Sequence, residues 1–277
     1  MDRRDFLKFT TLGVLLTPLR RLLGGPLEHA EYVHIWKENF FKQEAVDSSK
    51  AREGIIRAMV DGKWQKYEIR VLPDAFLEWN LNERLSNLDR MMKSEMPRLA
   101  GPHSGMIASY GIGRKDSRFT LNNAVKGLGF APKEEFIDDK LKHLKDTFED
   151  TPEKKMSFLM DIYKNPEVLN KNIQTSLELY TTPEFETHSF LNLIRNPQGT
   201  IVFLDNPSYE IRTIVRVIHP EDKTADSYER KIVEYTNLIH SYFHGKFSKK
   251  FIGLICYVIE VFDNSPGKKE ALGKRIV

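Results

Sequence analysis

The chain has 277 residues, of which 40% are hydrophobic and 11% aromatic, so it can bury the core of one large domain. Its 42 Lys and Arg residues against 39 Asp and Glu leave a net charge of +3, which excludes the strongly basic surface of a nucleic-acid-binding protein. Cys256 is the single cysteine, so no intramolecular disulfide or thiolate metal cluster can form. Its apolar surroundings, residues 252–262, predict that the thiol is buried.

The N-terminus carries a short basic motif followed by a weakly apolar run. Residues 3–8, RRDFLK, resemble the twin-arginine export signal. The run 9–19 is shorter than the roughly 20 residues that a spanning helix needs, so we predict a signal segment over residues 1–30 and no stable transmembrane span. The resemblance implies export of a folded, cofactor-loaded protein by the twin-arginine machinery, and a periplasmic or other extracytoplasmic location. The alternative is an amphipathic first helix of a cytosolic domain.

The next part of the chain predicts a hairpin and a helix. Two alternating runs, 55–60 and 63–72, flank Asp61-Gly62, and this arrangement is a strong hairpin signal. Residues 74–95 carry apolar side chains at helical spacing.

A glycine-rich segment and a charged segment follow. Residues 101–129 are rich in Gly, Ser and Asn, and the short apolar stretch 105–112 within them predicts a strand. Residues 132–172 are dense in alternating charges and predict helices broken at two prolines.

The last third of the chain predicts strands. Short β-rich runs cover 177–182 and 199–205, and an alternating run covers 209–219. A helix over 224–245 precedes a final strand over 250–263. Strands with one intervening helix and no regular βα alternation predict an α+β, mainly β fold, a small antiparallel barrel with appended helices.

One stretch of about forty residues carries a family resemblance. Tyr180-Thr181-Thr182 ends a predicted strand, Asn196-Pro197 ends the helix after it, the run TIVFLD follows, and the next strand carries two arginines. This order resembles the pyridoxamine 5′-phosphate oxidase superfamily, the FMN-binding split barrels. The resemblance implies one split-barrel domain over residues 31–277, with a helical insertion around 132–172. It also implies bound FMN, a homodimer, and oxidoreductase activity of unknown substrate.

The resemblance also implies a cofactor site. A flavin phosphate is a dianion, so it needs hydroxyl groups, N–H groups at a helix start and at least one cation. His188 and Ser189 stand where the family has Arg-Lys. Spaced four apart in a strand, Arg212 and Arg216 are expected on one face, together with Ile214. The expected cofactor-binding residues are Thr181, Thr182, Thr187, His188, Ser189, Arg212 and Arg216.

Two alternatives stay open. In one, the barrel binds haem, with His188, His240 or His244 as the axial ligand, since the last two share a helix face. In the other, the barrel binds no cofactor and serves as an accessory or structural subunit of an exported complex, which the missing Arg-Lys pair favours. The sequence assigns no catalytic acid or base.

Overall fold

The computed structural model describes residues 35–277, apart from residues 97, 99, 113, 115 and 268–272. The predicted signal segment therefore lies outside the described residues. Within the described part of the chain, no helix is long and apolar enough to cross a membrane.

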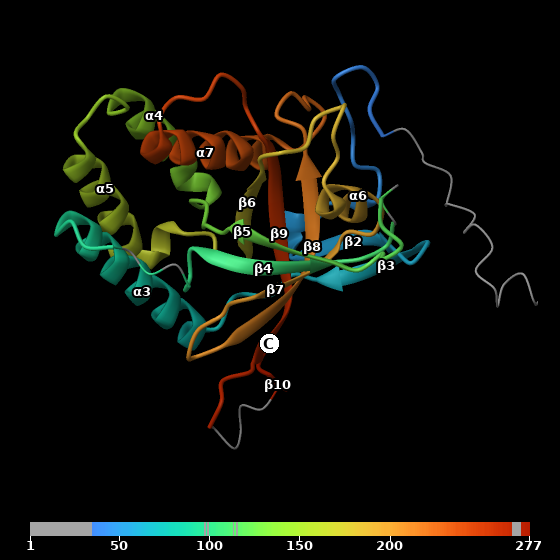
Figure 1. The fold of residues 1–277 in the computed structure, drawn as a ribbon, viewed down its shortest axis with the longest axis horizontal. Coiled ribbons are helices and arrows are strands. Elements are labelled where there is room, and N and C mark those ends of the chain that lie inside the picture. The colour runs from blue at the N-terminus through green and yellow to red at the C-terminus, as the bar shows by residue number, and fades with distance from the viewer. Residues whose placement is uncertain (1–34, 97, 99, 113, 115, 268–272) are drawn as a thin grey trace, which may run out of the picture. The chain divides into compact units, whose positions relative to one another are not determined.

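An antiparallel seven-stranded sheet forms the centre of the fold (Figure 1). Its strands follow the order β10-β9-β8-β7-β4-β5, and β6 pairs with β9 off that path. The fold is therefore mixed α/β with antiparallel pairing, as the strand-rich C-terminal third predicts. The strands of this sheet are β4 (Ser104–Ser109), β5 (Asn122–Gly127), β6 (Ile173–Glu178), β7 (Gln198–Val202), β8 (Tyr209–Ile218), β9 (Ile252–Asp263) and β10 (Lys274–Arg275).

The outer strands β5 and β6 approach each other, although the sheet does not close into a barrel. Gly129 and Thr175 form an isolated bridge, in which each N–H donates to the other's carbonyl at 2.9 and 2.8 Å. Nearby, Lys126 of β5 and Glu178 of β6 form an ion pair with Nζ and Oε2 2.6 Å apart, and both side chains are at most 10% exposed. One bridge and one buried ion pair thus connect strands at opposite ends of the path.

A smaller three-stranded sheet has the order β1-β2-β3. Its hairpin turns at Asp61-Gly62, where φ is +49° and +75°, so both turn residues adopt the left-handed conformation that this dipeptide tolerates. The predicted hairpin is confirmed. The strands are β1 (Val46–Asp47), β2 (Ile55–Val60) and β3 (Lys63–Glu68).

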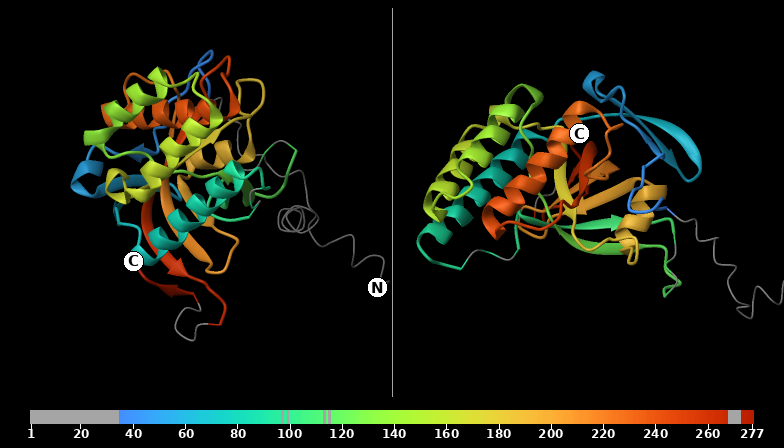
Figure 2. Two further views of the ribbon diagram at one scale, coloured as in Figure 1. Left: turned by 90° about the vertical axis from the view of Figure 1, so that its left-hand side faces the viewer. Right: turned by 90° about the horizontal axis from the view of Figure 1, so that it is seen from above.

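The helices fall into two groups in space. α3, α4, α5 and α7 lie together on one side of the molecule, and α6 lies apart from them, nearer the β2–β3 hairpin (Figures 1 and 2). Asp226 caps α7 by accepting hydrogen bonds from the N–H groups of Tyr228 and Glu229. The helices are α3 (Asp74–Met92), α4 (Glu134–Asp146), α5 (Pro152–Lys164), α6 (His188–Arg195) and α7 (Ser227–His244), with short 3₁₀ turns η1 (Ala51–Glu53) and η2 (Pro166–Val168).

Two strands differ from their prediction. The sequence pattern predicts no strand over Asn122–Gly127, because this stretch of the Gly-, Ser- and Asn-rich segment has few β-branched residues. Its pairing with β4 along all six residues makes it the strand β5. β6 begins at Ile173, four residues before the predicted start at Leu177, because its buried polar residues hide the pattern.

A buried arginine connects α3 to the sheet and to α5. Arg84 is 1% exposed and contacts no carboxylate among the described residues. Neutral acceptors satisfy its N–H groups instead. They are Asn80 Oδ1 at 2.7 Å, His103 Nδ1 at 3.1 Å, Tyr163 Oη at 3.3 Å, and the carbonyl oxygens of Pro102 and Leu128 at 2.5 and 2.9 Å.

Candidate functional site

The start of α6 brings two of the predicted threonines together. Thr187 is the N-cap, and its Oγ1 accepts a hydrogen bond from the N–H of Phe190 at 3.2 Å. Thr181 Oγ1 accepts from the N–H of Thr187, also at 3.2 Å, and the two hydroxyl oxygens are 3.2 Å apart. The first N–H groups of a helix have no intrahelical partner, so this end of α6 is a set of donors.

Three further predicted residues lie next to these threonines in the sequence, and each has a partner. Thr182 closes a turn with Phe185, whose N–H donates to Thr182 Oγ1 at 3.2 Å. His188 Nε2 lies 2.8 Å from the carbonyl oxygen of Ile112, so this nitrogen carries the proton and donates it. Ser189 is buried, and its Oγ accepts from Asn122 of β5 at 2.9 Å.

A cation that the sequence pattern does not predict lies near this helix start. Arg114, in the loop between β4 and β5, lies over the ring of Phe185, with Cζ 5.5 Å from the centroid. It forms a bidentate ion pair with Asp116. The hydrogen bond from Arg114 lowers the pKa of Asp116, and the nearby His188 lowers it further. Only its position after a Gly-x-Gly loop marked Arg114 in the sequence.

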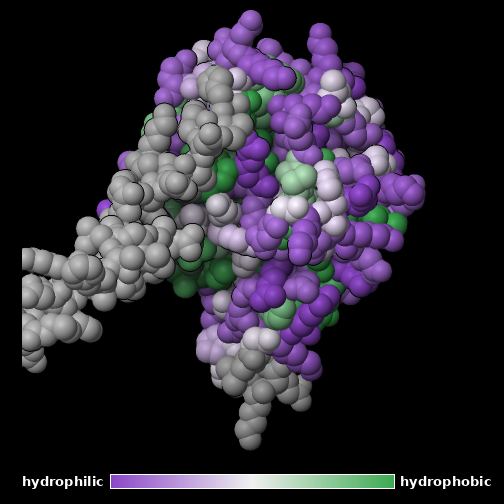
Figure 3. All heavy atoms as spheres, turned by 90° about the vertical axis from the view of Figure 1, so that its right-hand side faces the viewer, coloured by the Kyte–Doolittle hydropathy of each residue, from purple (hydrophilic) through white to green (hydrophobic). Residues whose placement is uncertain are grey.

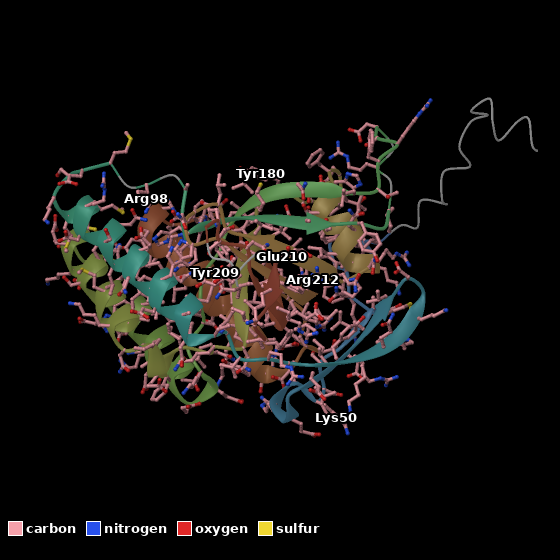
Figure 4. The ribbon with its side chains drawn as sticks, turned by 90° about the horizontal axis from the view of Figure 1, so that it is seen from below. Lys50, Arg98, Tyr180, Tyr209, Glu210 and Arg212 are labelled. Carbon is pink, nitrogen blue, oxygen red and sulfur yellow. The ribbon has the colours of Figure 1, made fainter. Side chains whose placement is uncertain are left out.

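Arg212 does not lie with the threonines. It points from β8 to the opposite face from Ile211, which is in the core that also contains Phe190 of α6. Its guanidinium donates to Glu210 at 2.9 Å and to Glu260 at 3.2 Å. Figure 4 shows Glu210 and Arg212 next to each other. The positive charge of Arg212 is therefore paired with carboxylates on the open face of the sheet.

Arg216 is a structural residue. It is 5% exposed, and its guanidinium donates to the backbone carbonyl of Gln43 at 3.0 Å. Its Nε lies 3.6 Å from Glu229 Oε2, and Tyr257 donates to the other oxygen of Glu229 at 2.9 Å. Arg212 and Arg216 therefore have different surroundings, because the smaller sheet and α7 cover the Arg216 end of β8 while the Arg212 end is open.

A cavity of about 420 Å³ lies on the open face around Arg212. Two tyrosines form its polar end: Tyr110 donates to the carboxylate of Asp61 at 2.9 Å, with its Oη 3.1 Å from Gln198 Oε1, and Tyr67 donates to Gln65 Oε1 at 3.1 Å. Burial raises the pKa of both phenols. None of the five threonine, histidine and serine residues at the start of α6 lines this cavity.

The histidines proposed as haem ligands lie on the last turns of α7. His240 and His244 have ring centroids 4.7 Å apart, and His240 stacks on Phe247. Burial and the nearby His244 lower the pKa of His240. Neither residue lines the cavity around Arg212. No group of three or more His, Cys, Asp or Glu residues in the described chain is arranged to hold a metal ion. Cys256 is buried, which raises its pKa to about 12.

Comparison with known proteins assigns neither a family nor a function to the chain. No family model matches the chain, and no curated protein matches it either. The function is therefore argued from the geometry at the start of α6 and from the resemblance of residues 177–218.

Proposed function

We propose that this protein is an exported, FMN-binding split-barrel oxidoreductase that holds the flavin phosphate at the start of α6. The observation that carries the proposal is the meeting of Thr181 and Thr187 at the first turn of this helix, with Arg114 and His188 beside them. These hydroxyl, N–H, guanidinium and imidazole groups are the donors that bind phosphate in other proteins. Seen from the side on which Figure 1 shows α6, the surface is mostly hydrophilic, as a site for an anion requires (Figure 3).

The arrangement of strands supports the split-barrel part of the proposal. The path β6-β9-β8-β7-β4-β5 is antiparallel throughout, and the Gly129–Thr175 bridge connects its two ends. A sheet whose outer strands meet, with a single backbone bridge between them in the described part of the chain, suits a barrel that is split on one side.

The donor groups at the start of α6 are of the kinds that bind a phosphate. Fewer residues supply them than the sequence predicts. Thr181, Thr187 and Arg114 would hold the phosphate, and the ring of His188 lies at the first position of the same helix. Arg212 and Arg216 are not part of the proposed site, because each forms an ion pair with a glutamate in another part of the fold. A bound phosphate would replace Asp116 as the partner of Arg114. FMN would supply the electron-transfer chemistry, and these residues would bind and orient it.

The test is the absorbance and flavin affinity of the purified full-length protein. We expect flavin absorbance in the protein from its native host. Arg114→Gln should weaken FMN binding by about 10- to 100-fold, the loss of one charged hydrogen bond, while Arg195→Gln, an exposed cation on the same helix, should leave the affinity unchanged. Equal FMN affinities of the wild type and Arg114→Gln would contradict the proposal that the phosphate binds at the start of α6.

A cofactor-free accessory subunit is the second candidate. It is favoured because each of the seven predicted residues already has a hydrogen-bond partner within the chain. A colourless protein with no measurable FMN affinity, purified from its native host, would support this candidate over the first. A haem Soret band would instead favour the haem alternative, for which the positions of His240 and His244 give no support.

Export is proposed from the twin-arginine motif alone. Replacing Arg3 and Arg4 by lysine should leave the protein in the cytoplasm, because the pathway discriminates between these two cations. Fractionation of cells that express each form measures the effect, and continued export of the double-lysine form would contradict the proposal.

A further inference from the structure

The loop after α7 displays three lysines without acidic partners. Lys246, Lys249 and Lys250 are exposed, and none of them forms an ion pair with a described residue. The whole segment 235–259 contains no Asp or Glu. The loop therefore carries a local positive charge that its own sequence does not neutralise.

Contacts at both ends hold this loop in place. The amide of Asn237 on α7 accepts from the N–H of Phe251 at 2.7 Å and donates to its carbonyl oxygen at 2.9 Å. Phe247 stacks on His240, with centroids 5.0 Å apart and planes 13° apart, and meets the edge of Phe251. The lysines thus lie on a fixed loop, where Lys249 Nζ is 5.6 Å from the ring centroid of Phe251, and Phe247 between them is 37% exposed.

The negative end of the α7 dipole does not account for all three cations. That effect falls off within the last turn of a helix, which here ends at His244. Lys246 lies close enough to benefit, whereas Lys249 and Lys250 lie beyond it in the chain.

We propose that this loop binds the surface of an anionic phospholipid membrane. Lysines attract lipid phosphates from outside the bilayer, and an exposed aromatic ring among them can enter the headgroup layer. Nucleic acid is a poorer partner, because typical sites neutralise six to ten phosphates and this loop offers three lysines on a protein of net charge +3. The inference does not depend on the flavin site.

The test is sedimentation of the full-length protein with vesicles at low salt. Vesicles of equal parts phosphatidylglycerol and phosphatidylcholine should retain the protein better than phosphatidylcholine alone, and added salt should release it. Each lysine near an anionic surface contributes about a five-fold factor in partitioning, so the Lys246→Gln, Lys249→Gln, Lys250→Gln triple variant should bind about 100-fold more weakly. Phe247→Ala should weaken binding by up to about 10-fold.

The matched control is the triple variant Lys63→Gln, Lys66→Gln, Lys223→Gln, which removes the same charge from exposed lysines that also have no ion pair. It should bind within a few-fold of the wild type. Equal losses in both triple variants would show a general charge effect and overturn the proposal, as would an absence of binding to anionic vesicles. Tighter binding to poly(U) RNA than to vesicles at the same salt would overturn the choice of lipid. Equal urea midpoints of all variants are required, and if the triple variant of the loop unfolds early, the single variant Lys249→Gln replaces it.

Discussion

Arg84 and His103 form a buried polar contact that constrains the state of the imidazole. Arg84 keeps its charge in the core because five neutral acceptors surround it, so His103 must offer Nδ1 as a lone pair. Burial of the ring, followed by the charge of Arg84, lowers the pKa of His103 to about 3. The imidazole is therefore neutral in the folded protein over the physiological pH range.

This contact predicts a loss of stability in mild acid. Between its ordinary pKa of 6.5 and about 3, His103 binds a proton in the unfolded chain but not in the folded one. The free energy of unfolding should therefore fall by up to about 1.4 kcal/mol per pH unit below about pH 6.5. Urea unfolding of the wild type and of His103→Gln, whose amide oxygen can still accept from Arg84, measures the difference. Parallel pH profiles for the two proteins would contradict the prediction.

At the scale of elements, α6 depends on its cap. It has only eight residues, which is too short for a stable isolated helix, so the Thr187 cap and the packing of Phe190 must hold it. The hydroxyl of Thr187 also contacts Thr181, three residues beyond the end of β6, and it thereby connects the start of α6 to the segment that follows the sheet.

Thr187→Ala should lower the free energy of unfolding by about 1 to 2 kcal/mol, since it removes the acceptor of the Phe190 N–H. Thr187→Ser keeps the oxygen and should recover most of that loss. Denaturant midpoints of the three proteins measure the effect. Alanine and serine forms of equal stability would assign the role of Thr187 to its methyl group instead.

Local signals explain which elements the sequence could predict. The Asp61-Gly62 hairpin, the Asp226 cap and the Thr187 helix start each depend on a few adjacent residues. β5 depends on pairing with β4, and no local pattern in Asn122–Gly127 reveals that partner.

The limited range of local sequence signals also explains why only some of the predicted site residues lie together in the structure. Thr181 and Thr187 are joined by a short turn, so the sequence could place them together. Arg212 and Arg216 share a strand face as alternation requires, but distant segments decide that Gln43 and Glu229 bury one of them while the other stays open. Arg114 comes from a loop more than sixty residues upstream of Thr181, beyond the reach of any local pattern.

At the scale of the whole molecule, the part of one sheet face formed by β5, β4 and β7 has no partner in the described chain, whereas the smaller sheet and α7 cover the Arg216 end of the same face. Register places Val125, Met106 and Val202 side by side on this face, and the first two are 73% and 39% exposed. The face continues into the charged row of Arg212 and Glu260 across β8 and β9. Apolar side chains at one end and paired charges at the other suit a surface that another protein covers.

We propose that a second copy of this chain covers that face, as the split-barrel resemblance implies. Val125→Glu would place an unpaired carboxylate in the contact and should weaken dimerisation by at least about 100-fold, whereas Val71→Glu makes the same substitution at a 53% exposed valine outside this face. Light scattering after size exclusion measures the mass of each form. Because a folded monomer of the Val125→Glu form must retain the circular dichroism of the wild type, the two measurements together separate loss of the dimer from loss of the fold. A wild-type protein that stays monomeric at high concentration would show that this face meets a different partner.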